Sequence, residues 1–390
     1  MKKVLGLILE LNPFHNGHKY FISKAKEEIK PDVTIAIITS SFSMRGEVSL
    51  IDKFTKADLC MQEGIDLVLE LPFLYANNSA DYFAYSAISI LNEAGITDLA
   101  FGTCIGSIDK LQQIYQYTLS DSYNSLLKTF LDKGNSYPNS ALKAFMEVCD
   151  DKELINNFTL PNNTLAIQYL KAINTINKNI IPHSIQRIDN MYFDKSLSAT
   201  NYSSATSLRE ALKNKEDISK YIFYSYDFVD EEGANANLYQ LLKYNLITKD
   251  IKSYQEIAAV NEGIENRLVN INDCLSYDEY LDNAATKRYP RNRLKRLILN
   301  ILLDTNKKYE NLSSYLPYLR ILRANDLGLK QIKNKKCITN LSKAFKDIDD
   351  DLKEILDFEL KVTKLYDLIT NKNIYKEEFI FGVKKWKLKK

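Results

Sequence analysis

Two of the three histidines in this 390-residue chain, His15 and His18, lie three residues apart in the segment LELNPFHNGH, residues 9–18. At helical i and i+3 spacing, their rings point to the same side. Paired imidazoles can donate hydrogen bonds to a triphosphate and stabilise the charge that develops as pyrophosphate leaves. Gly17 lacks a Cβ, so an adenine ring or a ribose can lie against the backbone there. The alternative is a pair of surface imidazoles on one helix face.

The elements around this segment fit a nucleotide site. Residues 4–11 form a continuous apolar run that ends in Asn12-Pro13-Phe14, as expected of a buried parallel strand, and a helix is predicted from Gly17. A helix N-terminus offers free N–H groups and the positive end of a dipole, which suits phosphate. Ligands of such folds bind at the C-terminal edge of the sheet.

Strands and helices alternate to about Lys213, which predicts an α/β fold with a Rossmann-like parallel sheet covered on both faces. From about Glu216 helical patterns dominate, as at 294–303 and 344–368. We therefore predict an ATP-binding catalytic domain over 1–215 and a mainly α-helical domain over 216–390. The predicted strands are 4–11, 33–39, 66–71, 99–102 and 180–187, and the predicted helices are 17–30, 53–62, 80–91, 110–119, 125–133, 140–149, 163–174 and 204–213.

Composition excludes several classes of protein. The chain is 45% hydrophobic and 26% charged, which is typical of a globular domain, and no apolar run approaches the ~20 residues of a membrane span. Its net charge of +2 gives no global attraction to nucleic acid. The five cysteines are scattered and lack C-x-x-C spacing, which argues against disulfides or a zinc site. We predict a cytoplasmic protein without a membrane segment, a resident metal or an obligate protein partner.

Several motifs, in order, resemble those of a known family. The H-x-G-H element resembles the signature of the HIGH (HUP) superfamily, and the absence of a KMSKS-like element favours its nucleotidyltransferases over its synthetases. The longer set resembles the bacterial tRNA(Met) cytidine acetate ligases. That set comprises NPFHNGH (12–18), RGE (45–47), DLVLELP (66–72), FG (101–102), PNN (161–163), SSATSLR (203–209) and, more faintly, RYPRNRLKRLILNILL (288–303).

The resemblance implies a two-step reaction. Acetate and ATP would form acetyl-adenylate and pyrophosphate, and the acetyl group would pass to the exocyclic amine of the wobble cytidine of elongator tRNA(Met), giving N4-acetylcytidine. Mg²⁺ is expected with ATP. We see no carboxylate cage in the sequence, so the ion is expected to be carried with the nucleotide.

The resemblance also implies site residues. His15 and His18 would be catalytic, and Asn162 or Asn163 would bond ribose or base, although an ordinary N-cap is the alternative. Ser204 would equally serve as a helix cap, with Arg209 on the triphosphate. The full ATP-binding set is Leu7, Ile8, Leu9, Glu10, Leu11, Asn12, Pro13, Phe14, His15, Asn16, Gly17, His18, Lys19, Tyr20, Gly102, Asn162, Asn163, Arg187, Ile188, Ser204, Thr206 and Arg209.

A local basic segment at 287–296 is the candidate RNA site, because it gathers lysine, arginine and a tyrosine around a helix start. The alternative is a solvated amphipathic helix, since Leu294, Leu297 and Ile298 belong to an apolar stripe. The C-terminal lysines at 384–390 are a weaker candidate. The predicted tRNA-binding residues are Arg288, Arg291, Arg293, Lys295 and Arg296.

Some positions depart from the family pattern, and the most altered loop is the one after the second strand, which would face the second substrate. Two other functions are therefore weighed. One is a small-molecule nucleotidyltransferase (an adenylyltransferase), and the other is a non-catalytic RNA-binding protein of the same fold. The departures are Leu11 for Tyr, Ser40 for Gly, Met44 for Gln, Cys104 for Glu and Ala166 for Gly.

Overall fold

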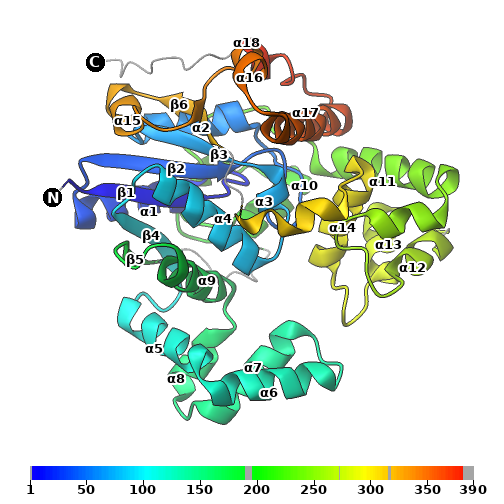
Figure 1. The fold of residues 1–390 in the computed structure, drawn as a ribbon, viewed down its shortest axis with the longest axis horizontal. Coiled ribbons are helices and arrows are strands. Elements are labelled where there is room, and N and C mark those ends of the chain that lie inside the picture. Colours follow the sequence, from blue (N-terminus) through cyan, green and yellow to red (C-terminus); the bar gives the residue numbers. More distant parts are fainter. Residues whose placement is uncertain (1, 189–195, 272, 315–317, 381–390) are drawn as a thin grey trace.

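The computed structural model describes residues 2–188, 196–271, 273–314 and 318–380, so the lysines at 384–390 lie outside it (Figure 1). Within these residues, seven strands form one sheet in the order β5-β4-β1-β2-β3-β6-β7. Neighbouring strands are parallel except β3 and β6, which are antiparallel. The strands are β1 (Val4–Leu9), β2 (Val33–Thr39), β3 (Leu67–Leu71), β4 (Asp98–Thr103), β5 (Ile181–Gln186), β6 (Leu319–Ala324) and β7 (Cys337–Ile338).

The N-terminal half supplies most of the helices that cover this sheet. Those between β4 and α9 form an insertion that projects away from the rest of the molecule, at the bottom of Figure 1. None of the described helices is both long and apolar enough to cross a bilayer. The helices are α1 (Asn16–Ile29), α2 (Lys53–Gln62), α3 (Phe73–Ala76), α4 (Ala80–Glu93), α5 (Ile108–Leu119), α6 (Asp121–Asp132), α7 (Tyr137–Val148), α8 (Lys152–Phe158), α9 (Pro161–Ile176) and α10 (Ala205–Lys213).

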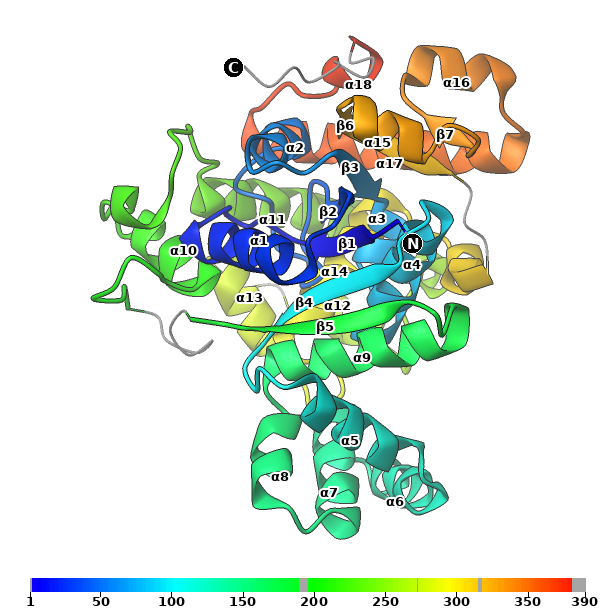
Figure 2. The ribbon, with the colours of Figure 1, turned by 90° about the vertical axis from the view of Figure 1, so that its left-hand side faces the viewer.

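The central strands are buried on both faces, which explains their continuous apolar sequences. In β2, the side chains of Val33, Ile35 and Ile37 pack in one hydrophobic cluster with α4 and α9. Ala36 and Ile38 pack in another with α1 and α2. Because successive side chains of a strand point to opposite faces, helices cover both sides of the sheet (Figure 2). The predicted α/β fold with a largely parallel, doubly covered sheet is confirmed.

The C-terminal half adds helices and an edge of the sheet. Helices α11 to α14 lie together on the right of Figure 1. Strands β6 and β7 extend the sheet beyond β3, and the last helices lie beside them. These elements are η1 (Ser219–Tyr221), α11 (Glu231–Thr248), η2 (Ile251–Glu256), α12 (Ile264–Asn270), α13 (Tyr277–Ala284), α14 (Arg291–Leu303), η3 (Lys307–Ser314), α15 (Asp326–Gln331), α16 (Leu341–Asp347), α17 (Asp350–Thr370) and α18 (Glu377–Ile380).

Strand β6 is not evident from the sequence. Its residues LRILRA include Arg320 and Arg323, and a strand with arginines on it does not show the apolar run of a buried strand. Both side chains are nevertheless buried, because each pairs with a carboxylate. The C-terminal half therefore completes the sheet of the N-terminal half, and the division at residues 215 and 216 stays a prediction.

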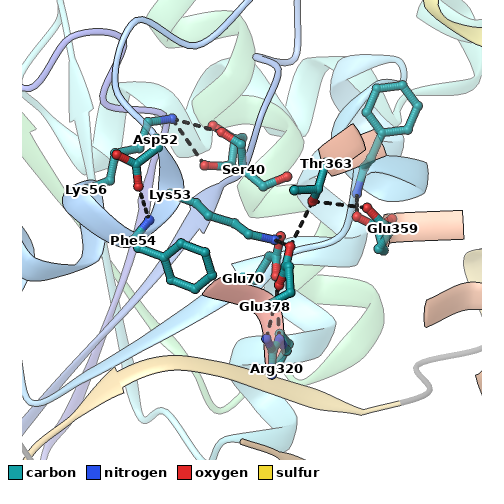
Figure 3. Close-up of polar contacts among 12 residues, drawn as sticks. Ser40, Asp52, Lys53, Phe54, Lys56, Glu70, Arg320, Glu359, Thr363 and Glu378 are labelled. Atoms are coloured by element: carbon teal, nitrogen blue, oxygen red, sulfur yellow. Dashed lines mark hydrogen bonds and ion pairs between the residues drawn. The ribbon is translucent and has the colours of Figure 1, made fainter. Parts of the chain in front are cut away.

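A buried cluster of charges joins α18 to the sheet (Figure 3). The Nζ of Lys53 lies 2.7 Å from Glu70 and 2.5 Å from Glu378. Arg320 lies 3.2 Å from the other oxygen of Glu378. Two cations and two carboxylates balance, so none of these charges is buried without a partner. The cluster fixes α18 and β6 against α2 and β3.

Candidate active site

A cavity opens where β1, β4 and β5 end and where α1 and α10 begin. This is the C-terminal edge of the parallel strands, where the sequence predicts a ligand. Most of the predicted ATP-binding residues line it. They are Ile8, Leu9, Glu10, Leu11, Asn12, His15, Gly17, His18, Tyr20, Gly102, Asn162, Arg187, Ile188, Ser204, Thr206 and Arg209.

The two predicted catalytic histidines lie together at the start of α1. Their ring centroids are 3.9 Å apart. His15 is the N-cap of the helix, and its Nδ1 accepts a hydrogen bond from the N–H of Gly17 at 3.0 Å. The Nδ1 of His18 accepts from the N–H of His15 at 3.3 Å. Because Nδ1 is an acceptor in both rings, each neutral imidazole carries its proton on Nε2 and donates from that atom.

His15 is held without charge. Its side chain is buried at 3% exposure. Burial, and the nearby charge of Arg187, lower the pKa of His15 to about 3. The ring is therefore a neutral N–H donor at neutral pH, and it stabilises an anion through an oriented dipole rather than as a cation.

Three of the backbone amides at the start of α1 have partners within the chain, which limits the phosphate site that the sequence predicts there. The N–H of Gly17 donates to the His15 ring, and the N–H groups of His18 and Lys19 donate to the His15 carbonyl at 2.9 and 3.2 Å. The helix also begins one residue before the predicted start, at Asn16. The donor offered to a phosphate at this helix end is therefore the imidazole N–H of His15, because these amides already bond to His15.

Helix α10 brings an arginine to the same place. Ser204 is its N-cap, since Oγ accepts the N–H three residues later at 3.1 Å. One turn further, Nη1 of Arg209 donates to the carbonyl of Asn12 at 3.3 Å. Its guanidinium also pairs with Glu47 at 3.2 Å and with Glu231 at 3.7 Å. The SSATSLR and NPFHNGH segments therefore meet at one end of the cavity.

The opposite side is built by β4, β5 and α9. Asn162 lines the cavity, whereas Asn163 is buried and its Oδ1 accepts the N–H of Cys104 at 2.9 Å. Neither asparagine is the N-cap of α9. A Cβ on Gly102 would meet a single atom of the described residues, Cγ of Arg187, at 3.6 Å. The space above Gly102 therefore belongs to the cavity.

The other predicted ATP-binding residues do not line the cavity. They are either packed in the protein interior or committed to other partners. The Asn16 amide donates to the carbonyls of Asn201 and Lys220, and Lys19 pairs with Glu63 at 3.2 Å. Local sequence proximity to the histidines does not place these side chains at the ligand. The residues are Leu7, Pro13, Phe14, Asn16, Lys19 and Asn163.

The cavity also contains residues outside the predicted set. Ser43, Arg45 and Glu47 come from the loop after β2. The RGE motif at residues 45–47 was the feature of the sequence that pointed to this loop. Phe83 of α4 and Tyr169 of α9 form part of an apolar wall. These two aromatics resemble ordinary core residues in the sequence, so only the packing of their helices identifies them.

In the predicted RNA-binding segment, Arg288 faces outward, whereas Arg293 is half-buried. Arg288 is 59% exposed and pairs with Glu262 at 3.0 Å, and the guanidinium of Arg293 lies 3.9 Å from the ring centroid of Tyr289. Arg291 forms ion pairs with two carboxylates of α13. The segment therefore combines a basic surface with contacts that hold α13 and α14 together.

The remaining two basic residues point toward the cavity loop. Lys295 lies 3.5 Å from Glu47, and Arg296 donates to the carbonyl of Met44 at 3.3 Å. The apolar side of α14, including Leu294 and Leu297, is buried. Helix α14 is therefore amphipathic, as the alternative interpretation expected, and its polar side includes these contacts with the nucleotide site.

Comparisons with known proteins agree with this geometry. Residues 1–379 match the family described as HIGH Nucleotidyl Transferase, which is the class that the fold and the paired histidines define. The tRNA(Met) cytidine acetate ligase of Caldicellulosiruptor bescii is 34% identical over 94% of each chain, and that of Clostridium perfringens is 32% identical over 94% of this chain and 95% of its own. The chain belongs to the tRNA(Met) cytidine acetate ligase family.

Solved structures give the same result. Thermotoga maritima TmcAL without ligand matches with a TM-score of 0.87 at 28% identity, over 98% of this chain and 99% of that chain. TmcAL bound with alpha-thio ATP matches with a TM-score of 0.83 at 29% identity, over 95% of each chain. The similarity spans both halves of the chain.

Proposed function

We propose that this protein is an ATP-dependent acetate ligase that forms acetyl-adenylate and acetylates the wobble cytidine of elongator tRNA(Met). The observation that carries the proposal is the cavity in which His15, His18 and Arg209 converge at the open edge of the sheet. Its support is the family of the chain, whose named members are tRNA(Met) cytidine acetate ligases, together with a structural neighbour bound to an ATP analogue. ATP and tRNA meet in the cytoplasm, where we place the reaction.

The residues divide the work by chemistry. Neutral His15 and His18 donate from Nε2 to the triphosphate, and Arg209 supplies positive charge from α10. Asn162 offers its amide to ribose or base, and Gly102 leaves room for the nucleotide to lie close to the backbone. The predicted set is thereby reduced to the residues that line the cavity.

Adenylation must come first, because acetate has no usable leaving group. An acetate oxygen attacks the α-phosphorus and pyrophosphate leaves, which forms the mixed anhydride. The cytidine amine then attacks the acetyl carbon, AMP leaves, and the amine loses a proton. Cytidine is a weak nucleophile, so orientation supplies much of the rate. We propose that the anhydride is held non-covalently between the histidines and the Arg45-Gly46 loop.

Magnesium accompanies the nucleotide in this proposal. No group of three or more His, Cys, Asp or Glu side chains among the described residues is arranged to hold a metal. Glu10 and Glu47 line the cavity, but the first accepts the N–H of Met44 at 2.7 Å and the second pairs with cations. These contacts fit an ion that is coordinated mainly by the phosphates.

The test is pyrophosphate exchange by the purified chain, without a protein partner. We expect acetate to stimulate exchange, and phosphopantetheine and nicotinate mononucleotide not to do so. The opposite pattern would identify a small-molecule nucleotidyltransferase, and no exchange at all would favour a non-catalytic RNA-binding protein. Labelled acetate with ATP alone should yield acetyl-adenylate, whereas label bound covalently to the protein would contradict the mechanism. Acetylation of elongator tRNA(Met), read by nucleoside mass analysis, completes the test.

A further inference from the structure

The loop between β2 and α2 lies between the nucleotide site and α14. Phe42 and Val48 form a bridge that closes it into a tight turn, and Ser43 N–H donates to the Glu47 carbonyl at 2.9 Å. Ser43, Arg45 and Glu47 line the cavity from this turn. The turn is therefore a short, closed structure with one side on the cavity.

Both ends of this loop are anchored, one by the cavity residue Asn12 and the other by Lys56 of α2. The side-chain amide of Asn12 donates to the Val48 carbonyl at 3.1 Å, and its oxygen accepts the N–H of Leu50 at 2.9 Å. At the other end, buried Lys56 donates to the carbonyls of Thr39 and Ser40, both at 3.2 Å (Figure 3). The loop is thus held in place where it leaves β2 and where it returns.

The other side of the turn rests on α14. Gly46 adopts φ +72°, and a Cβ there would come within 2.7 Å of the Arg296 backbone nitrogen. Arg296 in turn donates to the carbonyl of Met44 at 3.3 Å. The contact is backbone against backbone, so a displacement of α14 is transmitted directly to the turn.

One carboxylate joins the two sides of this contact. Oε2 of Glu47 lies 3.2 Å from Nη2 of Arg209, and Oε1 lies 3.5 Å from Nζ of Lys295. The side chain of Glu47 is 11% exposed, so solvent screens these charges little. Burial alone would raise the pKa of Glu47, but Arg209, Lys295 and Arg45 outweigh it and lower that pKa, so the group is ionised.

We propose that Glu47 is a positioning residue that couples α14 to the nucleotide site through its shared hold on Arg209 and Lys295. The proposal rests on the proposed function, in which Arg209 binds the triphosphate. To do so, the guanidinium must give up part of its pairing with Glu47. Lys295 competes with Arg209 for the carboxylate of Glu47 and so weakens the Arg209–Glu47 ion pair. The position of Lys295 on α14 therefore sets how easily Arg209 can leave Glu47 and bind the triphosphate of ATP.

The proposal predicts changes of opposite sign. Glu47→Gln removes the competing charge, so ATP should bind at least about threefold more tightly. Pyrophosphate exchange should nevertheless turn over several-fold more slowly, because Arg209 is less well oriented. Lys295→Met removes one of the cations that share Glu47 with Arg209, so Glu47 should hold Arg209 more strongly and ATP should bind about threefold more weakly. In the Glu47→Gln background, Lys295→Met should have little further effect.

The experiment is calorimetric titration of the full chain with Mg-ATP, without tRNA, alongside exchange kinetics. Lys252→Met, an exposed lysine on η2 far from this loop in sequence, is the matched control and should bind ATP as the wild type does. If Glu47 had only a structural role, Glu47→Gln would weaken ATP binding, and that result would overturn the proposal. So would an equal effect of Lys295→Met in both backgrounds, which would make Lys295 a direct phosphate ligand. A wild type that binds no ATP would overturn the proposed function and the coupling together.

Discussion

The carbonyl oxygen of Asn12 accepts a hydrogen bond from Nη1 of Arg209 at 3.3 Å, across 197 residues of sequence. This contact joins the end of β1 to the first turns of α10. The guanidinium and the paired histidines line the same cavity, where an anionic ligand would meet both. The predictions below follow from this arrangement and from the groups buried behind it.

Replacing His18 with Ala should lower pyrophosphate exchange by about 100-fold or more, because an oriented donor to the developing charge is lost. The fold should survive, since the ring lies at a helix end on the cavity. Exchange kinetics and circular dichroism measure the two effects. The matched control is His183→Gln: this histidine pairs with Asp98 at 2.7 Å and does not line the cavity. Near-normal exchange by the His18 variant would refute the site.

His15 should remain neutral well below the usual pKa of histidine. With a folded-state pKa of about 3 against 6.5 for the free side chain, the unfolded chain binds the proton first as pH falls. Its contribution to the free energy of unfolding is therefore present above pH 6.5 and is lost progressively as pH drops toward 3. Nitrogen-15 NMR can follow all three histidines. His15 should show a protonated Nε2 and no titration near 6.5; a midpoint there would contradict this assignment.

Arg288→Gln should weaken tRNA binding and reduce its salt dependence, by a slope of roughly 0.7–0.9 for one lost phosphate contact. Arg288 is suited to this test because it is exposed and its pairing with Glu262 is at the surface. Charge reversal of Arg296 is not, since it would also disturb the Met44 loop. Binding is measured at several salt concentrations, with Lys252→Gln as the control. An unchanged slope would remove Arg288 from the RNA surface.

Glu359→Gln should stabilise the protein at alkaline pH. Burial raises the pKa of Glu359 to about 8, and its Oε2 accepts the N–H of Phe73 at 3.0 Å, which a Gln oxygen can replace. Folding of the wild type takes up a proton between 4.5 and about 8, so its free energy of unfolding falls as pH rises through this window.

The variant cannot titrate there, so its advantage should grow with pH and reach a few degrees in Tm, since one kcal/mol shifts the Tm of a chain of this length by roughly 1 °C. Melting curves from acid to alkaline pH measure the difference between Glu359→Gln and the wild type. A difference that is constant with pH would show that folding does not raise the pKa of Glu359, and would contradict this prediction.

The sequence by itself determined the strands and most helices of the N-terminal half, although not α3 and α8, and the segments that carry the site. Buried parallel strands such as β2 are apolar along their whole length, so they are visible without any partner. The pair His15 and His18 is local, at the spacing of one helical turn, and the structure confirms that the rings are adjacent. Local spacing and composition were sufficient for these features.

Only the tertiary structure decided which side chains of those segments reach the cavity. Asn162 and Asn163 are equivalent in sequence, but the direction of α9 turns one to the cavity and the other to Cys104. The two arginines of β6 can be buried because each pairs with a carboxylate. Those partners, Asp58 and Glu378, come from elements distant in sequence, so the strand could not be predicted locally. The contact of Glu47 with both Arg209 and Lys295 likewise depends on three segments meeting. Such choices depend on long-range packing and charge pairing, which no local pattern contains.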